Sequence, residues 1–322
     1  MTTTDPHRNR RDVTERVDLT RPEAVAQAVC DIYLDTYGGS SHIGLLQKAF
    51  RDFAALFEGR YDGYHACDTL YHDTQHTLDV TLAMARLMNG HERSHPLHRL
   101  GSQRFVLGIV IALFHDAGYI RHEADGAVPN GAVFTLTHVS RSGEFLRRYL
   151  PRLGMARYAR LATVLVHYTG YEVDLDDLHP HDPRDRKLGH LLGTADLIAQ
   201  MSDRCYLEKC RDRLYPEFVL CGLAGEGRPG HTPVFRSPAD LLRKTPDFYR
   251  HSVEKRLDGH FNRAYRYVEA FFGEENHYMA RIRKNIDFLE RIREQDPGQR
   301  LRRQPPVILP VQAEPLRLLR PA

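Results

Sequence analysis

Apolar residues recur at helical spacing along most of the chain between residues 22 and 294. In the first such segment, Val25, Val29 and Ile32 fall on one stripe, as expected for an amphipathic helix with one face against a core. Residues 105–115 are apolar all round, which is typical of a helix buried in the middle of a fold. No stretch shows the alternation and hairpin turns of a β-sheet. The pattern therefore predicts an all-α fold.

The predicted helices are separated by short polar or glycine-containing turns, such as Gly38-Gly39 and Asn89-Gly90, which favour helix ends. We expect helices at residues 22–37, 43–57, 74–88, 105–115, 136–149, 156–168, 186–201, 203–223, 238–252, 253–272 and 277–294.

Composition and charge favour a soluble globular protein. Of the 322 residues, 42% are hydrophobic and 27% charged, as in ordinary soluble domains. The 45 Lys and Arg residues nearly balance the 42 Asp and Glu residues, for a net charge of +3, so neither nucleic acid nor an anionic membrane is expected as a partner. The longest apolar run is too short to span a bilayer. Five cysteines without a CxxC pair indicate a reducing compartment, and we expect a cytoplasmic location.

Two segments about forty residues apart supply candidate metal ligands. His115 and Asp116 end the most apolar run, where a buried carboxylate needs a partner to offset its desolvation, and a divalent metal is the natural one. His76 lies in the earlier segment, on a predicted helix that Asp73 is expected to cap. His72, just ahead of this cap, would lie near the same face without being forced onto a metal. This placement suits a general acid that protonates a leaving oxygen.

Three further candidate ligands follow at helical intervals. His138, His167 and Asp196 lie 22, 51 and 80 residues after Asp116, which fits one ligand from each successive helix. Asp196 is embedded in a largely apolar helix, where an unpaired charge would be expensive. Helical bundles that project His and carboxylate side chains inward can hold a dinuclear centre, and Asp116 could then bridge two metals.

Four other polar residues are candidates for supporting or substrate-contacting roles. Asp79, three residues after His76, is expected to support catalysis by fixing the local geometry of the ligands. Gln200, one turn after Asp196, could face a nucleobase. Arg141 could meet a phosphate, and His122 could line the mouth of the site. A packing or solvated role is the competing interpretation for each of them.

The pattern Tyr71-His72-x-x-x-His76-x-x-Asp79-Val80, together with His115-Asp116 and Asp196, resembles the motif set of the HD superfamily of metal-dependent phosphohydrolases. The first segment is similar to the cyclic-nucleotide phosphodiesterase signature Tyr-His-Asn-x-x-His-Ala-x-Asp-Val. The chain departs from it at Asp73 and Thr77, neither of which is a ligand position. The resemblance covers about residues 40–200, and the last third of the chain lies outside it.

This resemblance implies an HD-domain helical bundle with additional C-terminal helices. It also implies two divalent metal ions, with no selection among Mn, Fe, Mg, Zn and Ni. The first metal would be held by His76, His115, Asp116 and Asp196. Asp116 would bridge to a second metal, and His138 and His167 match the additional histidine ligands of dinuclear members. His72 would be the proton donor.

The expected function is hydrolysis of a small-molecule phosphoester, such as a cyclic nucleotide or another nucleotide, by metal-activated hydroxide. One alternative is a mixed-valent diiron oxygenase that uses the same ligands. A second is a non-catalytic nucleotide-binding sensor. A homodimer is compatible with the sequence but is not indicated by it.

The chain divides into four expected segments. Residues 1–20 are expected to form a disordered arm, residues 21–221 the metal-binding core, and residues 222–294 a helical extension packed on it. Residues 295–322 form a Pro/Arg-rich tail. The tail is either disordered or extended across the domain or a partner.

Overall fold

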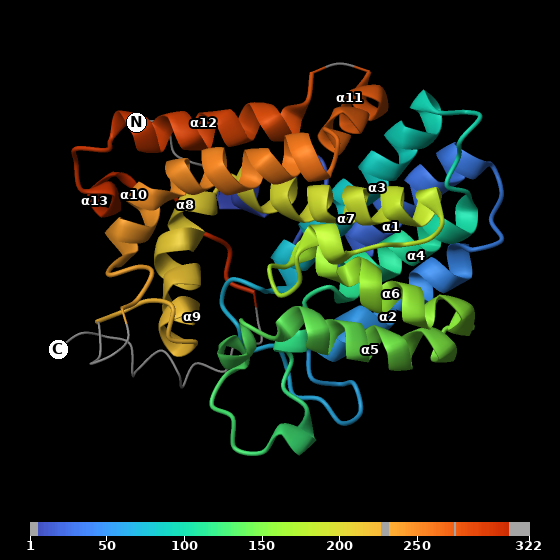
Figure 1. Ribbon diagram of the computed structural model, residues 1–322, viewed down its shortest axis with the longest axis horizontal. Helices are drawn as coiled ribbons and strands as arrows, with labels where there is room; N and C mark the ends of the chain where they lie inside the picture. Colours follow the sequence, from blue (N-terminus) through green and yellow to red (C-terminus); the bar gives the residue numbers. More distant parts are fainter. Residues whose placement is uncertain (1–5, 227–231, 274, 309–322) are drawn as a thin grey trace.

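The computed structural model describes residues 6–226, 232–273 and 275–308. These residues form helices joined by loops, with isolated bridges but no β-strand (Figure 1). The predicted all-α class is therefore confirmed. Within the same ranges, no helix combines the length and the apolar character needed to cross a membrane.

The α-helices are α1 (Pro22–Tyr37), α2 (Ile43–Phe57), α3 (Thr74–Ser94), α4 (Ser102–Phe114), α5 (His138–Arg152), α6 (Ala159–Leu165), α7 (Pro183–Ser202), α8 (Tyr206–Lys209), α9 (Tyr215–Leu220), α10 (Pro238–Phe248), α11 (Tyr267–Phe272), α12 (His277–Arg291) and α13 (Pro297–Arg300). Short 3-10 turns are η1 (Pro6–Arg10), η2 (Ala117–Tyr119), η3 (Glu123–Asp125), η4 (Gly131–Phe134), η5 (Ala156–Tyr158), η6 (Val166–Thr169), η7 (Leu175–Asp177) and η11 (Ala264–Arg266), and π-helical segments are η8 (Cys210–Leu214), η9 (Tyr249–Val253) and η10 (Lys255–His260).

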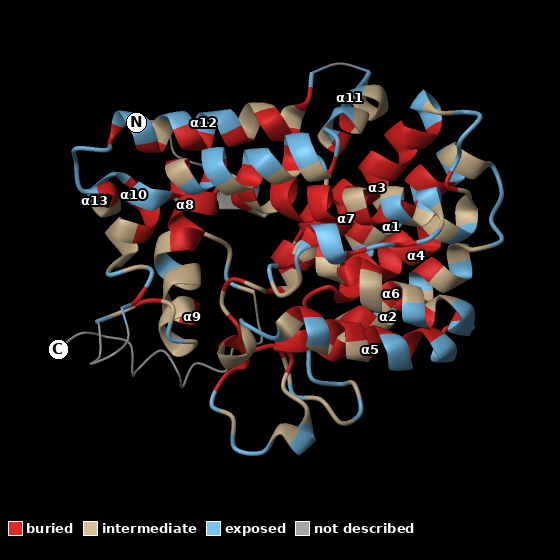
Figure 2. Cartoon of the chain, in the orientation of Figure 1, coloured by how far each residue is buried: buried red, intermediate tan, exposed pale blue. Residues whose placement is uncertain are grey.

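Helices α3, α4 and α7 form the centre of the molecule. Helix α3 packs against α1, α4, α7 and α11, while α7 also packs against α12. Figure 2 shows buried residues concentrated along α3 and α7. Every residue of α4 from Phe105 to Phe114 is buried, as the all-round apolar pattern predicts. The central helices are therefore held by neighbours on several sides, which gives their ends fixed positions.

Helix α3 continues past the Asn89-Gly90 pair that was predicted to end it, and runs to Ser94. Gly90 serves a different purpose here, because a Cβ atom on it would lie only 1.7 Å from the carbonyl oxygen of Tyr267. The glycine therefore allows α11 to approach α3 closely. Asn89 likewise points its amide at Asp35 and Thr36 instead of capping the helix.

The carboxyl-terminal helices are more broken than the sequence predicts. The segment 203–223 is divided into α8, η8 and α9, and the segment 253–272 is interrupted where Asn262 and Arg263 adopt positive φ angles of 51° and 56°. A π-helical turn inserts one residue into a helix, and this barely changes an apolar pattern averaged over several turns. The predicted division of this region at residue 222 stays a prediction.

Residues near both ends pack on the helical core. The predicted disorder of the amino-terminal arm does not hold for residues 6–20, because buried Asp12 pairs with Arg86 of α3 at 2.5 Å. The arm also meets the tail, where the Asn9 side chain donates to the Gln304 carbonyl at 3.0 Å. Of the two states expected for the tail, residues 301–308 therefore adopt the extended one against the domain. Residues 1–5 and 309–322 lie outside the described residues.

Candidate metal centre

The start of α3, the end of α4 and the interior of α7 bring the main candidate ligands together. His76 lies in the first turn of α3, which Asp73 caps by accepting a hydrogen bond from the His76 amide at 2.9 Å, as predicted. Asp73 is itself fixed by an ion pair with Arg213 at 2.9 Å. His115 ends α4 and Asp116 follows it. Because the His-Asp pair directly follows the apolar helix α4 in the sequence, two polar groups lie at the inner end of a buried helix.

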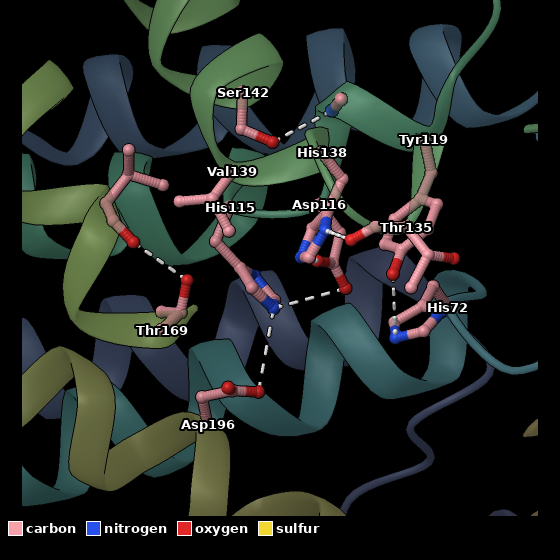
Figure 3. Close-up of polar contacts among 12 residues, drawn as sticks. His72, His115, Asp116, Tyr119, Thr135, His138, Val139, Ser142, Thr169 and Asp196 are labelled. Atoms are coloured by element: carbon pink, nitrogen blue, oxygen red, sulfur yellow. Dashed lines mark hydrogen bonds and ion pairs between the residues drawn. The ribbon is translucent and has the colours of Figure 1, made fainter. Parts of the chain in front are cut away.

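Two imidazoles and two carboxylates face one another at short range. Asp116 Oδ2 lies 3.2 Å from His115 Nε2 and 3.3 Å from His76 Nε2. Asp196 Oδ1, from α7, lies 3.7 Å and 3.6 Å from the same two nitrogens. In Figure 3 the two carboxylates approach His115 from different sides. All four residues are at least nine-tenths buried.

The donor atoms of this cluster fit a divalent cation. His115 Nδ1 donates to the Ala112 carbonyl at 2.8 Å, which leaves Nε2 as the ligand atom. Among the described residues, neither His115 Nε2 nor Asp116 Oδ2 has a hydrogen-bond partner, and buried polar atoms without partners are costly. One ligand atom from each of His76, His115 and Asp116 lies within 4.8 Å of the others. A single metal ion bound between them would satisfy these atoms together.

The electrostatics of the cluster also favour a bound cation. Burial disfavours the charged form of His115, yet Asp116 and Asp196 together raise its pKa to about 9. Burial also disfavours the charged form of Asp116 and so raises its pKa, but His115 and His76 outweigh this and hold the pKa of the carboxyl well below the usual value. Burial raises the pKa of Asp196. A metal needs neutral histidine ligands, so binding would displace the His115 proton and would strengthen as the pH rises.

His138 lies on the other oxygen of the Asp116 carboxylate. Its Nδ1 donates to the Thr135 carbonyl at 2.7 Å, and its Nε2 lies 3.8 Å from Asp116 Oδ1. Asp116 therefore faces His76 and His115 with one oxygen and His138 with the other, an arrangement suited to a carboxylate that bridges two metals. Glu172 accepts hydrogen bonds from the Val139 and Ser140 amides and so fixes the start of α5, where His138 lies.

The role of His167 as a ligand stays a prediction. The predicted helix 156–168 is divided into η5, α6 and η6, so the direction of the His167 side chain does not follow from the periodicity of one continuous helix. No ion pair or hydrogen bond joins its side chain to the other candidate ligands in the described part of the chain, and its Nδ1 has no partner there. Burial lowers the pKa of His167, which the Glu172 carboxylate partly opposes.

Asp79 also lies outside the ligand group, so its predicted role beside His76 is not supported. It is one turn further along α3 and lines a narrow cavity with Asp12 and Asp203. Its Oδ1 has no hydrogen-bond partner among the described residues, and burial raises the pKa of Asp79 well above the usual value. Residues three apart lie on the same face of a helix, but at Asp79 this face is covered by the amino-terminal arm.

The three residues predicted to contact the substrate all have partners within the protein, and two of them hold a loop away from the ligand group. Arg141 binds both carboxylate oxygens of Asp125, at 3.1 Å and 2.7 Å, and its guanidinium lies 3.7 Å from the centre of the Phe134 ring. His122 caps η3 and accepts a hydrogen bond from the Ala124 amide. Both residues hold the loop after Asp116. Gln200 remains a candidate, because it accepts a hydrogen bond of 3.3 Å from the Tyr71 hydroxyl, beside His72.

His72 is held by a buried glutamate that the sequence pattern did not reveal. Its Nδ1 donates to Glu217 Oε2 at 2.6 Å, while Glu217 Oε1 accepts from the Tyr71 amide at 2.6 Å. Burial lowers the pKa of His72, but attraction to Glu217 outweighs it, so the net pKa is raised. His72 Nε2, which lies 3.5 Å from the Tyr119 hydroxyl (Figure 3), is thus the nitrogen available to deliver a proton.

Tyr119 connects His72 with the metal-ligand group. Its ring stacks on the His72 ring with centroids 4.2 Å apart and on the His138 ring at 4.4 Å. Tyr119 follows the His115-Asp116 pair closely in the chain, so its place near the site could have been predicted from sequence proximity. Glu217 lies 145 residues from His72, and no motif or spacing signals their contact.

No family model matches this chain, and neither a curated protein nor a solved structure matches it. The chemistry of the site has to be inferred from its own side chains.

Proposed function

We propose that this protein is an HD-type metal-dependent phosphohydrolase that cleaves a small-molecule phosphoester, of which nucleotides are the main candidates. The observation that carries the proposal is the convergence of His76, His115, Asp116 and Asp196 on one buried point, with a glutamate-paired His72 close by. The ring centroids of His72 and His76 are 5.7 Å apart. The motif resemblance of these residues to HD phosphohydrolases supports the same conclusion.

The donor set defines where metals would bind. His76, His115, Asp196 and one oxygen of Asp116 would hold the first ion, and His138 with the other oxygen of Asp116 would contribute to the second. Imidazole and carboxylate ligands suit several divalent metals, including Mn, Fe, Zn and Ni. Bound divalent ions lower the pKa of water and neutralise phosphoryl oxygens.

His72 would act as the general acid. In the hydrolysis of a phosphoester, a water oxygen joins phosphorus and the bond from phosphorus to the leaving oxygen breaks. The leaving oxygen takes a proton from His72 Nε2, and His72 recovers the proton that the water releases. Glu217 stabilises the imidazolium form and directs Nε2 away from itself. This arrangement favours hydrolysis over the oxygenase alternative, because oxygen activation by a diiron centre requires no such paired acid.

The proposed cellular location is the cytoplasm. All five cysteines are unpaired, and four of them are buried, as expected of a protein that works under reducing conditions.

The proposal is tested with metal-stripped protein that is reloaded separately with Mn, Fe(II), Mg, Zn or Ni. Phosphate or nucleoside release from a panel of phosphomonoesters, nucleotides and cyclic nucleotides is measured beside O2 consumption. We expect metal-dependent hydrolysis of at least one class and no substrate-dependent O2 uptake. O2 uptake with iron and no hydrolysis would favour the oxygenase instead. Tight nucleotide binding without any turnover would favour the sensor.

Replacing Glu217 by glutamine is expected to move the alkaline limb of the activity profile to lower pH, by about one unit. The carboxylate raises the pKa of His72, and a general acid works only while protonated. Activity is therefore retained below this pKa and lost as the pH rises through it. In the E217Q variant this loss would occur at a lower pH. The measurement is kcat against pH at saturating metal.

The matched control is Glu144→Gln, which removes a surface carboxylate paired with Arg147 and Arg148 and should leave the profile unchanged. An E217Q protein that folds and binds metal normally, with an unshifted alkaline limb, would exclude Glu217 as the residue that tunes His72.

A further inference from the structure

Arg256, in the π-helical segment η10, has no carboxylate partner in the described parts of the chain. Its guanidinium lies 3.7 Å from the centre of the Tyr171 ring, and its Nη2 donates to the Gly170 carbonyl at 2.7 Å. Other arginines around the site, such as Arg121 and Arg213, are paired with aspartates. Arg256 is thus a half-buried cation that is held in place but not neutralised.

The two segments that Arg256 joins pack against α7 close to Asp196. Gly193, one turn before Asp196 on α7, has room only for a hydrogen: a Cβ there would lie 2.6 Å from the Tyr168 carbonyl oxygen and 2.5 Å from the Phe261 ring. Tyr168 leads directly into the Gly170-Tyr171 segment, and Phe261 directly follows η10. In Figure 1 the orange segment that contains η10 runs beside α7.

The same segment also contacts the start of α5, where His138 lies. A Cβ on Gly170 would lie 2.4 Å from the Val139 side chain, and Glu172 caps the helix that begins with His138. The residues from Gly170 to Glu172 therefore bridge Arg256 and His138.

The electrostatics agree with this placement. Burial lowers the pKa of Arg256, while the Tyr171 hydroxyl and the Asp196 and Asp174 carboxylates act against it. Arginine keeps its charge in proteins, so a guanidinium in this position favours an anion beside Asp196.

An exposed aromatic pair adjoins the guanidinium. The Tyr171 residue is 60% exposed and Phe248 is 43% exposed, and their ring centroids lie 6.5 Å apart. These two rings offer a face on which a flat group could stack.

We infer that Arg256 binds the phosphoryl group of the substrate from the Asp196 side of the metal centre, and that Tyr171 and Phe248 contact a flat ring attached to that phosphate. Guanidinium groups bind phosphate oxygens through paired hydrogen bonds, and stacking on Tyr171 already fixes the orientation of this one. The inference rests on the proposed function, because it assigns Arg256 to the phosphoester that the metal centre would cleave. It narrows the substrate class to phosphoesters that carry an aromatic ring, such as a nucleobase.

The test measures binding of inorganic phosphate and of adenosine 5′-monophosphate to manganese-loaded protein by titration calorimetry. We expect Arg256→Ala to weaken both probes about tenfold or more, with unchanged metal content, and Arg256→Lys to restore part of the affinity. Tyr171→Ala should weaken the nucleotide more than inorganic phosphate. The matched control is Arg250→Ala, since Arg250 lies in the preceding π-helical segment and pairs with Asp247 and Glu290.

Failure of this inference can be separated from failure of the proposed function. Nucleotide binding that depends on Arg256, in a protein that hydrolyses nothing, would uphold the binding role and reject the hydrolase. Hydrolysis by the wild-type protein, together with an R256A variant that binds both probes with wild-type affinity, would uphold the hydrolase and reject the binding role of Arg256. Absence of binding of either probe to the wild-type protein would overturn the inference, and an equal loss for both probes in Tyr171→Ala would overturn the ring contact.

Discussion

Replacing Asp116 by alanine is expected to abolish both metal binding and turnover. Its two carboxylate oxygens face different imidazoles, His76 and His115 on one side and His138 on the other. Loss of the side chain therefore removes a ligand from each candidate metal position. Partners that merely support a ligand are worth 10–100-fold in affinity or activity, so removing the shared ligand should cost more, about a thousandfold or greater in turnover. Metal content per chain and phosphate release are the two measurements.

The control for this variant is Asp79→Asn. Asp79 is equally buried on the same helix as His76 but lies outside the ligand group, so its variant should keep its metal. Thermal unfolding monitored by circular dichroism establishes that both variants fold. Wild-type turnover by a folded, metal-free D116A protein would refute the role assigned to Asp116.

Replacing His72 by asparagine is expected to leave metal content intact and to lower kcat by about 10²–10⁴-fold, the usual contribution of general acid catalysis. His72 is held by Glu217 and makes no ion pair with the candidate ligands among the described residues. The loss should depend on the leaving group. An alkyl or ribosyl oxygen needs a proton as it departs, whereas p-nitrophenolate leaves without one, so the p-nitrophenyl ester should lose far less activity.

Comparison of the two ester types separates the acid from a structural role. An equal loss with both esters, or loss of the metal, would show that His72 positions the site and does not donate a proton. Wild-type rates with both esters would remove His72 from the mechanism.

Much of the fold and the inner ligand set follows from local sequence. The all-round apolar pattern of α4 marks a buried helix, and a His-Asp pair at its end has to find partners in the interior. Asp73 before His76 is a capping residue in both sequence and structure. Asp196 could be identified because a carboxylate in an apolar helix needs compensation. These predictions depend only on residues within one or two helical turns.

The remaining features depend on contacts between distant segments. Glu217 contacts His72 from 145 residues away, and Asp79 lies beside Asp12 of the arm instead of the candidate ligands. Arg141 carries the positive charge that a phosphate contact requires, but it already forms an ion pair with Asp125. The predicted helix that carries His167 is replaced by three short helical segments, so the periodicity of one continuous helix does not fix the direction of its side chain. Helical spacing fixes the face on which a residue lies, but tertiary packing decides what that face meets.

The buried His and Asp cluster is proposed to bind a divalent metal that is required for phosphoester hydrolysis. The most direct measurement titrates metal-stripped wild-type protein with Mn²⁺ and follows bound metal and phosphate release in the same samples. The expected result is that hydrolysis rises in proportion to bound metal and saturates with it, while D116A protein shows neither. Undiminished hydrolysis by the metal-stripped protein, or a fully loaded protein that cleaves no phosphoester, would contradict the claim.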